Sequence, residues 1–371
     1  MRELKLQNAI DILYGCAVLG TGGGGNLKTG INLITKDFQK GKRLFLMDIS
    51  EIEDEEYIAT PYGCGAPRQE DEEMNEKFKN FKRLDFPASI LAFKKLEKFL
   101  DKKFVAVAST ELGGENTAEA LHVACQLGIP LIDGDPAGRS VPELQHSSYF
   151  IKNEPITPMA ISTNFGEVII IENILNDFRA EEIVRSIAVA SGDEVGVVDH
   201  PICGKNIKNA IIPNAISYAE KIGKIIRTSK ENHEIVEERI IKEIESKMLF
   251  KGELDKVIWE PKGGFNIGNI YLKGVDKYKG ETYRIWFKNE NIVSYKNDKL
   301  DASVPDLICM IDQNGDPITT PNFKDKMIMV ILGLPSPEIW KTAKGLEIFG
   351  PKSFGFDFEY SPLFPSKEYK K

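Results

Sequence analysis

The sequence has no uninterrupted run of the ~18 apolar residues that a membrane-spanning helix needs. Its first residues, Met1-Arg2-Glu3-Leu4-Lys5, are charged and lack the apolar stretch of a signal peptide. The five cysteines are scattered and form no Cys-x-x-Cys pair, which argues against a zinc ribbon or a disulfide framework. We therefore expect a cytoplasmic protein with reduced thiols and no membrane partner.

Positive charge is in deficit, because the 48 Lys and Arg residues are outnumbered by 56 Asp and Glu residues, which gives a net charge of −8. Without a basic stripe the chain is not expected to bind nucleic acid. It has only four histidines, and neither His-Glu-x-x-His nor His-x-His spacing occurs, so a histidine-based zinc site is not supported.

The length and the periodicity of the chain predict two domains. Chains longer than roughly 250–300 residues usually divide into domains with separate hydrophobic cores, and this chain has 371 residues. Short apolar strands at 104–108 and 130–132 alternate with helical stretches, which predicts an N-terminal α/β domain with a mostly parallel sheet, residues 1–164. Residues 165–371 are expected to form a β-rich C-terminal domain with a helical insertion, because short strands and turns dominate from residue 248 onward. The helical stretches expected in the first domain are 4–19, 26–38, 87–100 and 116–127.

The run Gly20-Thr21-Gly22-Gly23-Gly24-Gly25-Asn26 lies between two of these helices. It contains the spacing G-x-G-x-x-G, but the dinucleotide fingerprint follows a strand, and no Lys-Ser/Thr follows to make a P-loop. Free N–H groups at a helix start can hold a carboxylate, a phosphate or a polarised carbonyl oxygen. We therefore predict that Thr21, Gly22, Gly23, Gly24 and Gly25 bind substrate. The alternative is a tight crossing between the two helices, although consecutive glycines cost folding entropy.

Polar segments follow two of the predicted buried strands. Ligands of open α/β sheets bind beyond the carboxyl ends of the strands, so Glu111 to Asn116 and Asp133 to Glu143 are expected to face one cleft. Glu111 can point into this cleft as a catalytic group. Asn116 either caps the following helix or contacts substrate.

The segment from Asp133 to Glu143 permits two kinds of chemistry. Its carboxylates can bind a divalent metal, with Asp133 and Asp135 as ligands. They can equally supply an acid and a base, and Asp135 and Glu143 are then the catalytic candidates. Arg139 either clamps a carboxylate or imide of the substrate or forms an internal salt bridge with Glu143.

Cysteine and histidine give weaker predictions. Gly63-Cys64-Gly65 is expected to be a glycine turn, but a nucleophilic thiol needs a base or positive surroundings, and none is visible for Cys64. His122 is expected to be structural in mid-helix, and His146 is close enough to the acidic segment to reach the same cleft. His200 is predicted to lie in a turn, Val198-Asp199-His200-Pro201.

Several ordered motifs carry a family resemblance over about residues 8–362. The N-terminal motifs are Thr21-Gly22-Gly23-Gly24-Gly25, Gly65-Ala66-Pro67, Glu111-x-Gly-Gly-x-Asn116 and Asp133-x-Asp135-x-x-Gly138-Arg139-x-x-Pro142-Glu143. The C-terminal motifs are Pro305-Asp306-Leu307-Ile308, Leu334-Pro335-Ser336-Pro337 and Gly350-Pro351-x-x-Phe354-Gly355. Together they resemble the S-methyl-thiohydantoin desulfurase family, which is often labelled hydantoinase-like. The resemblance implies an N-terminal α/β domain, a β-rich C-terminal domain and, for some members, hydrolysis of an S-methyl thiohydantoin to a hydantoin and methanethiol in ergothioneine breakdown.

Three functional hypotheses follow. The first is a hydrolase of a cyclic amide or thioimidate, in which Asp135 or Glu143 is the base, Gly65 lines the site and Arg139 holds a substrate carboxylate. The second is a non-catalytic ligand-binding subunit that works with a hydantoinase-type partner. The third is a metal-dependent enzyme. A homo-oligomer is compatible with each of them.

Overall fold

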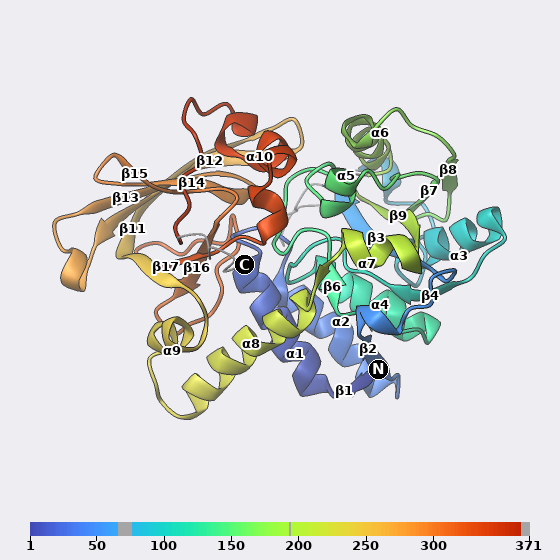
Figure 1. Ribbon diagram of the computed structural model, residues 1–371, viewed down its shortest axis with the longest axis horizontal. Coiled ribbons are helices and arrows are strands. Elements are labelled where there is room, and N and C mark those ends of the chain that lie inside the picture. The colour runs from blue at the N-terminus through green and yellow to red at the C-terminus, as the bar shows by residue number, and fades with distance from the viewer. Residues whose placement is uncertain (66–75, 193, 365–371) are drawn as a thin grey trace, which may run out of the picture.

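The computed structural model describes residues 1–65, 76–192 and 194–364, and these contain two large β-sheets and a small two-stranded one (Figure 1). The first sheet has eight strands in the order β1-β2-β5-β4-β3-β9-β7-β8. Its strands are β1 (Arg2–Leu4), β2 (Leu44–Met47), β3 (Tyr57–Gly65), β4 (Phe104–Val107), β5 (Leu131–Ile132), β7 (Met159–Thr163), β8 (Val168–Ile171) and β9 (Glu194–Cys203). The expected α/β class of the N-terminal domain is thereby confirmed.

The first sheet is mixed, whereas a mostly parallel sheet was predicted. Its centre, β2-β5-β4-β3, is parallel. The outer pairs β1-β2, β3-β9, β9-β7 and β7-β8 are antiparallel. The strand β9 contains the segment predicted to be a turn around His200, so that prediction was wrong. Because β8 and β9 come from beyond residue 164, the sheet itself does not end at the predicted domain boundary.

Helices alternate along the chain with the strands of this sheet; the first four lie where apolar spacing predicted them, whereas the short helices at 148–152 and 204–210 were not predicted. They are α1 (Leu6–Leu19), α2 (Leu27–Gln39), α3 (Ala88–Leu100), α4 (Asn116–Leu127), α5 (Ser148–Lys152), α6 (Asp177–Ala190) and α7 (Gly204–Ala210). Asn26 caps α2, because its side chain accepts from the N–H groups of Lys28 and Thr29. A small two-stranded ladder, β6 (Gly134–Asp135) with β10 (Ile212–Pro213), holds the acidic segment beside the first sheet.

The second sheet has seven antiparallel strands in the order β15-β14-β13-β12-β11-β17-β16. They are β11 (Lys247–Lys262), β12 (Phe265–Gly274), β13 (Thr282–Lys288), β14 (Glu290–Lys296), β15 (Lys299–Ser303), β16 (Leu307–Asp312) and β17 (Ile328–Leu334). Alternation explains its buried face: in β13, Tyr283, Ile285 and Phe287 are buried while their neighbours are not. Helices α8 (Ala215–Glu231) and α9 (Val236–Glu243) precede the sheet, and α10 (Ala343–Phe349) follows it.

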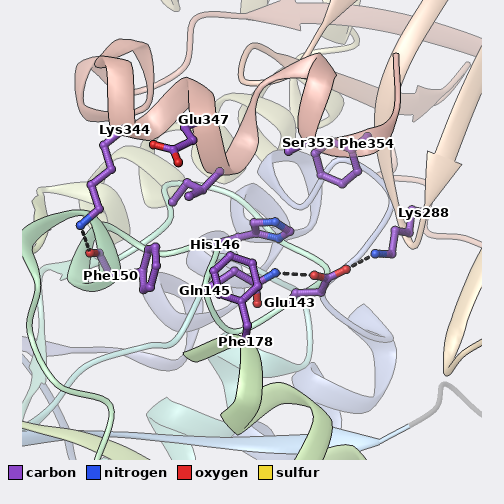
Figure 2. A pocket seen from close by; sticks show the side chains of 11 residues that line it. Glu143, Gln145, His146, Phe150, Phe178, Lys288, Lys344, Glu347, Ser353 and Phe354 are labelled. Carbon is purple, nitrogen blue, oxygen red and sulfur yellow. Dashed lines mark hydrogen bonds and ion pairs between the residues drawn. The ribbon is translucent and has the colours of Figure 1, made fainter. Parts of the chain in front are cut away.

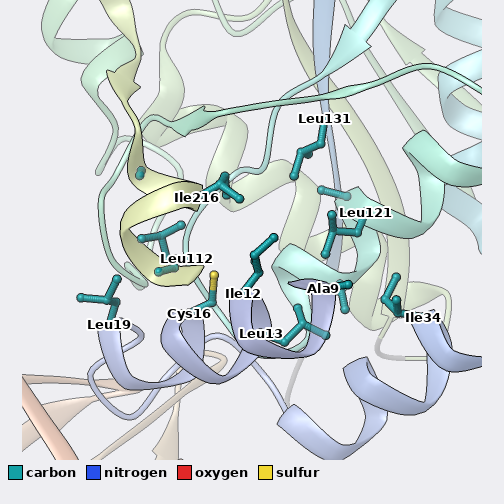
Figure 3. Close-up of a cluster of buried hydrophobic side chains, with 14 of the residues drawn as sticks. Ala9, Ile12, Leu13, Cys16, Leu19, Ile34, Leu112, Leu121, Leu131 and Ile216 are labelled. Atoms are coloured by element: carbon teal, nitrogen blue, oxygen red, sulfur yellow. The ribbon is translucent and has the colours of Figure 1, made fainter. Parts of the chain in front are cut away.

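The two sheets share one core through the crossing of α1 and α8 (Figures 1 and 3). The helices approach closely because glycines lie at the contacts: a Cβ on Gly15 would be 1.8 Å from the Ala219 carbonyl oxygen. Cys309 and Leu332 of the second sheet belong to the same apolar cluster as Leu19 of α1. In the described part of the chain, no helix combines the length and apolar character needed to cross a membrane.

Candidate functional site

The three polar segments singled out in the sequence meet in the structure. The Gly24 carbonyl accepts hydrogen bonds from the N–H groups of Glu115 at 2.9 Å and Asn116 at 3.3 Å. The Leu112 N–H donates to the Arg139 carbonyl at 3.2 Å, and the Ser140 hydroxyl donates to the Leu112 carbonyl at 2.7 Å. The glycine run and both strand-end segments are therefore in contact with one another, but of the predicted site residues in them only Glu143 lines the cavities described below.

The opposite side of the glycine run contacts the second sheet. The Thr21 carbonyl accepts from the Asn291 N–H, and the Gly22 carbonyl accepts from the Thr320 N–H, both at 2.8 Å. A Cβ on Gly23 would lie 1.9 Å from a carboxyl oxygen of Glu290, so a side chain at this position would displace the Glu290 carboxyl group. The run thus lies at the junction of the two domains.

Arg139 is fully buried at this junction, where its five N–H donors face five acceptors. Nε donates to the Ser140 carbonyl, and the terminal nitrogens donate to the Thr21 hydroxyl and to three main-chain carbonyls. Those carbonyls belong to Pro305, Asp306 and Asn291, all in the C-terminal domain. Arg139 makes no salt bridge with Glu143 in this arrangement, and its donors are already occupied by the protein.

Two of the predicted catalytic carboxyl groups are deeply buried. Glu111 accepts from the Asn116 side chain at 2.6 Å and from the Val141 N–H at 2.7 Å, and burial raises its pKa to about 7. Asp135 accepts from the N–H groups of Ala137 and Gly138, and burial raises its pKa to about 8. Asn116 is the first residue of α4 and bonds Glu111, so its side chain does not cap that helix.

Asp133 is held by a different segment from Asp135. Its carboxylate accepts from the N–H of Ser217 at 2.8 Å and from the hydroxyl of the same residue. Among residues 1–65, 76–192 and 194–364, no three His, Cys, Asp or Glu side chains are grouped so that they could hold a metal ion. The prediction that Asp133 and Asp135 bind a metal ion therefore has no support from the geometry of the described residues.

Glu290, at the start of β14, was not found from the sequence. It is 3% exposed, and its Oε2 has no hydrogen-bond partner among the described residues. Burial, and then the nearby Glu111 carboxyl, raise the pKa of Glu290 well above its usual range. The only local signal is the polar run from Lys288 to Asn291, which interrupts two apolar strands.

A cavity of about 300 Å³ is lined by residues that include Glu143 and Lys288 (Figure 2). Glu143 forms an ion pair with Lys288 from β13, and its other oxygen accepts from the Gln145 side chain. Burial lowers the pKa of Lys288, while the carboxyl group of Glu290 acts in the opposite direction. Lys288 therefore interacts electrostatically both with Glu143 in the cavity and with the buried carboxyl group of Glu290.

The walls of the cavity come from both domains and combine three phenylalanine side chains with charged and polar ones (Figure 2). Phe150 and Phe178 contribute from α5 and α6, and Phe354 contributes from the turn after α10. His146 also lines the cavity, as its position after the acidic segment suggested. A neighbouring cavity of about 430 Å³ shares Glu143 and adds Arg185 and Phe265.

Cys64 and Gly65 lie in strand β3, so the predicted glycine turn was wrong at these positions. Burial raises the pKa of the Cys64 thiol to about 12, which keeps it protonated and unreactive at neutral pH. Gly65 ends the strand, and the following Ala66-Pro67 lie outside the described residues. His122 is in mid-helix as expected, with its Nδ1 2.6 Å from a carboxylate oxygen of Asp37.

The fold and the cavity define a class of two-domain proteins in which a mixed α/β sheet and an antiparallel sheet enclose a small polar site. Two family models match in tandem: "S-Me-THD-like, N-terminal domain" over residues 7–173 and "S-Me-THD-like, C-terminal domain" over residues 175–363. The chain belongs to this S-Me-THD-like family.

A crystal structure of a protein from Chromobacterium violaceum has the same fold. It superposes with a TM-score of 0.79 over 98% of this chain and 100% of that chain, at 18% sequence identity. No curated protein matches the sequence significantly.

Proposed function

We propose that the protein is a hydrolase of a small cyclic amide or thioimidate, with an S-methyl thiohydantoin as the first substrate to test. The observation that carries the proposal is the Glu143–Lys288 ion pair in a cavity of about 300 Å³ whose lining includes the phenylalanine rings of residues 150, 178 and 354. A planar heterocycle has flat apolar faces that suit such walls and polar edges that need a charged pair. Family membership supports the same class of substrate.

In the proposed reaction, water attacks the ring carbon that carries the methylthio group. Glu143 takes one proton from this water, and Lys288 gives a proton to the adjacent ring nitrogen, where negative charge develops. The tetrahedral intermediate then collapses to a carbonyl, and its hydroxyl proton returns to Lys288. Methanethiolate leaves and takes the proton held by Glu143, so the products are a hydantoin and methanethiol.

The experiment measures methanethiol released from an S-methyl thiohydantoin with a thiol-reactive dye. The wild type is expected to turn over, and Glu143→Gln is expected to lower kcat by about 10²- to 10⁴-fold, the usual contribution of a general base. Glu231→Gln is the matched control, because Glu231 is an exposed partner of Arg227 on α8. Absence of methanethiol with the wild type, or full activity in Glu143→Gln, contradicts the proposal.

A further inference from the structure

His200 on β9 is a buried histidine that lies between two carboxyl groups. It is 3% exposed, and its Nδ1 lies 2.8 Å from a carboxylate oxygen of Asp199. Its other ring nitrogen, Nε2, lies 3.9 Å from Oδ2 of Asp177, the first residue of α6. Nε2 and this Oδ2 form no hydrogen bond with any described residue, and 3.9 Å is too long for one between them. Whether the two atoms attract or repel each other therefore depends on a proton.

Hydrogen bonding to Asp199 fixes the hydrogen on Nδ1. The Asp199 carboxylate also accepts from the Tyr62 hydroxyl at 2.8 Å, and an ionised carboxylate can only accept. Nδ1 therefore carries a hydrogen, so Nε2 is an N–H donor in the charged ring and a lone pair in the neutral ring. The charged ring attracts the Asp177 carboxylate, whereas the neutral ring presents its lone pair to it. One proton, on Nε2 or on the Asp177 carboxyl group, is needed to keep this contact favourable.

The pKa of His200 reflects two opposing effects. Burial lowers it, but the charges of Asp199, Asp177 and Glu154, with the hydrogen bond to Asp199, together raise it above its ordinary value of 6.5. Tyr149 of α5 packs its ring against that of His200, with the centroids 4.8 Å apart. Burial raises the pKa of Tyr149 far above the neutral range, so its hydroxyl adds no charge here. The imidazole ring is therefore still charged at pH 6.5.

The carboxyl group of Asp177 has a different balance. Burial raises its pKa to about 6, and the charge of Asp199 acts in the same direction. The charges of His200 and then of Lys344, from α10, oppose this shift. Between about pH 6 and the higher pKa of His200, both members of the pair are charged and attract each other.

Asp177 lies at the start of the helix that lines both cavities. The next residue, Phe178, contributes to the wall of each of them (Figure 2). Farther along α6, Ala180 is fully buried and Glu181 accepts from the Leu144 N–H. The rest of the helix is thus held by other contacts, and the pair with His200 acts on its first turn.

We propose that Asp199, His200 and Asp177 form a proton-dependent latch that holds the first turn of α6, and with it Phe178, against β9. With the proton bound, the first turn is closed and Phe178 completes the wall of the two cavities. When the proton leaves, the Asp177 carboxylate faces a neutral ring and the first turn opens toward solvent. The latch goes beyond the proposed hydrolase activity and does not depend on which ligand the cavities bind.

The direction of the pH effect follows from the raised pKa of His200. In the open form the ring is hydrated and has an ordinary pKa of 6.5, whereas in the closed form it binds its proton more tightly. Opening therefore becomes easier as the pH rises from 6.5 through the pKa of the closed form. Because one proton is released, the equilibrium constant for opening rises by up to about tenfold per pH unit in this window.

Amide hydrogen exchange of the wild type measures this opening. The reporting amides are those of residues 180–182, because the Ala180 N–H donates to the Asn176 carbonyl at 3.0 Å and the next two donate to the first turn. After correction for the intrinsic exchange rate, their protection is expected to fall by up to about tenfold per pH unit above pH 6.5. The amides of α8 are the internal reference for changes in overall stability.

Asp177→Asn separates the proton from the shape of the side chain. Its amide can accept from the charged ring or donate to the neutral one, so the protection of residues 180–182 is expected to be the same at each pH. Asp177→Ala removes the partner of His200 and is expected to give low protection throughout. Asp54→Asn makes the same change at an exposed aspartate that pairs with Lys208, and it should keep the wild-type profile.

A purely structural contact would give the wild type and Asp177→Asn the same pH profile, and that result overturns the inference. Protection of residues 180–182 that changes only in step with α8 overturns it as well. If Asp177→Ala does not fold, the comparison of Asp177→Asn with the wild type still decides. Methanethiol release tests the hydrolase proposal separately, so either proposal can fail without the other.

Discussion

Arg139 is a buried charge whose hydrogen bonds go to carbonyls and one hydroxyl, with no carboxylate among its partners. Arg139→Met leaves five acceptors without a donor, so we expect a loss of about 3–5 kcal/mol in the free energy of unfolding, measured with urea. Arg139→Lys keeps the charge with fewer donors and should lose less. Arg179→Met, at an exposed pair with Glu182, should cost at most about 1 kcal/mol.

The outcome for Arg139 also tests the substrate clamp predicted from the sequence. A variant that is as stable as the wild type but binds hydantoin poorly would favour the clamp. A destabilised variant whose folded fraction binds normally would favour the role at the domain junction.

The raised pKa of Asp135 is expected to make the stability of the protein depend on pH. Its pKa is about 8 in the folded protein against an ordinary value of 3.8, so between these values the folded state binds more protons than the unfolded state. This contribution is complete below pH 3.8 and is lost as the pH rises through 8. We expect the wild-type Tm to fall between about pH 4 and 8, and to fall less in Asp135→Asn, whose side-chain oxygen can still accept from Ala137 and Gly138. Equal slopes for the two proteins would refute this assignment.

At the scale of elements, the glycine run is held by contacts that exclude a side chain. A Cβ on Gly24, where φ is +78°, would lie 2.4 Å from both the Gly113 Cα and the Ser140 hydroxyl. Gly24→Ala should therefore lower the free energy of unfolding by about 2–5 kcal/mol, through steric overlap and left-handed backbone strain. Gly63→Ala is the control, because nothing lies within 4 Å of its Cβ position. Equal stability of both variants would mean that the loop adapts easily.

Local periodicity was sufficient for most elements but not for their pairing. Apolar spacing predicted helices at 87–100 and 116–127, and the structure has α3 at Ala88–Leu100 and α4 at Asn116–Leu127. The strand β9 was missed because Asp199, His200 and Pro201 resemble a turn. Pairing with β3 and β7 on either side holds this segment as a strand despite its turn-like sequence. His200 still has a φ of +43°, the left-handed value that is common in turns.

Local sequence likewise identifies some residues of the candidate site but not those that distant segments bring to it. Glu143 and His146 were recognisable because they follow a strand end in the chain. Lys288, Glu290 and Phe354 come from the other domain, and nothing in their local sequence specifies which surface they meet. Their roles depend on how the second sheet docks on the glycine run, which is a property of packing between distant segments.

At the scale of the whole molecule, the family division near residue 174 does not separate two independent cores. The strand β9, which follows that point, lies between β3 and β7 of the first sheet. Residues of α1, α8 and β16 share a single apolar cluster, and Arg139 bonds the main chain of both domains. Breaking either sheet therefore exposes apolar surface of the other.

We accordingly expect the full chain to unfold in one cooperative transition, with equal van't Hoff and calorimetric enthalpies. A fragment of residues 1–173 lacks β9 and α8 and should show no cooperative melting on its own. Arg139→Met provides the internal comparison, because it removes bonds across the junction and should lower the temperature of the whole transition without splitting it. Two separate heat-absorption peaks in the wild type, or a stably folded fragment 1–173, would mean that the cores are independent and that the cavity between them is free to open.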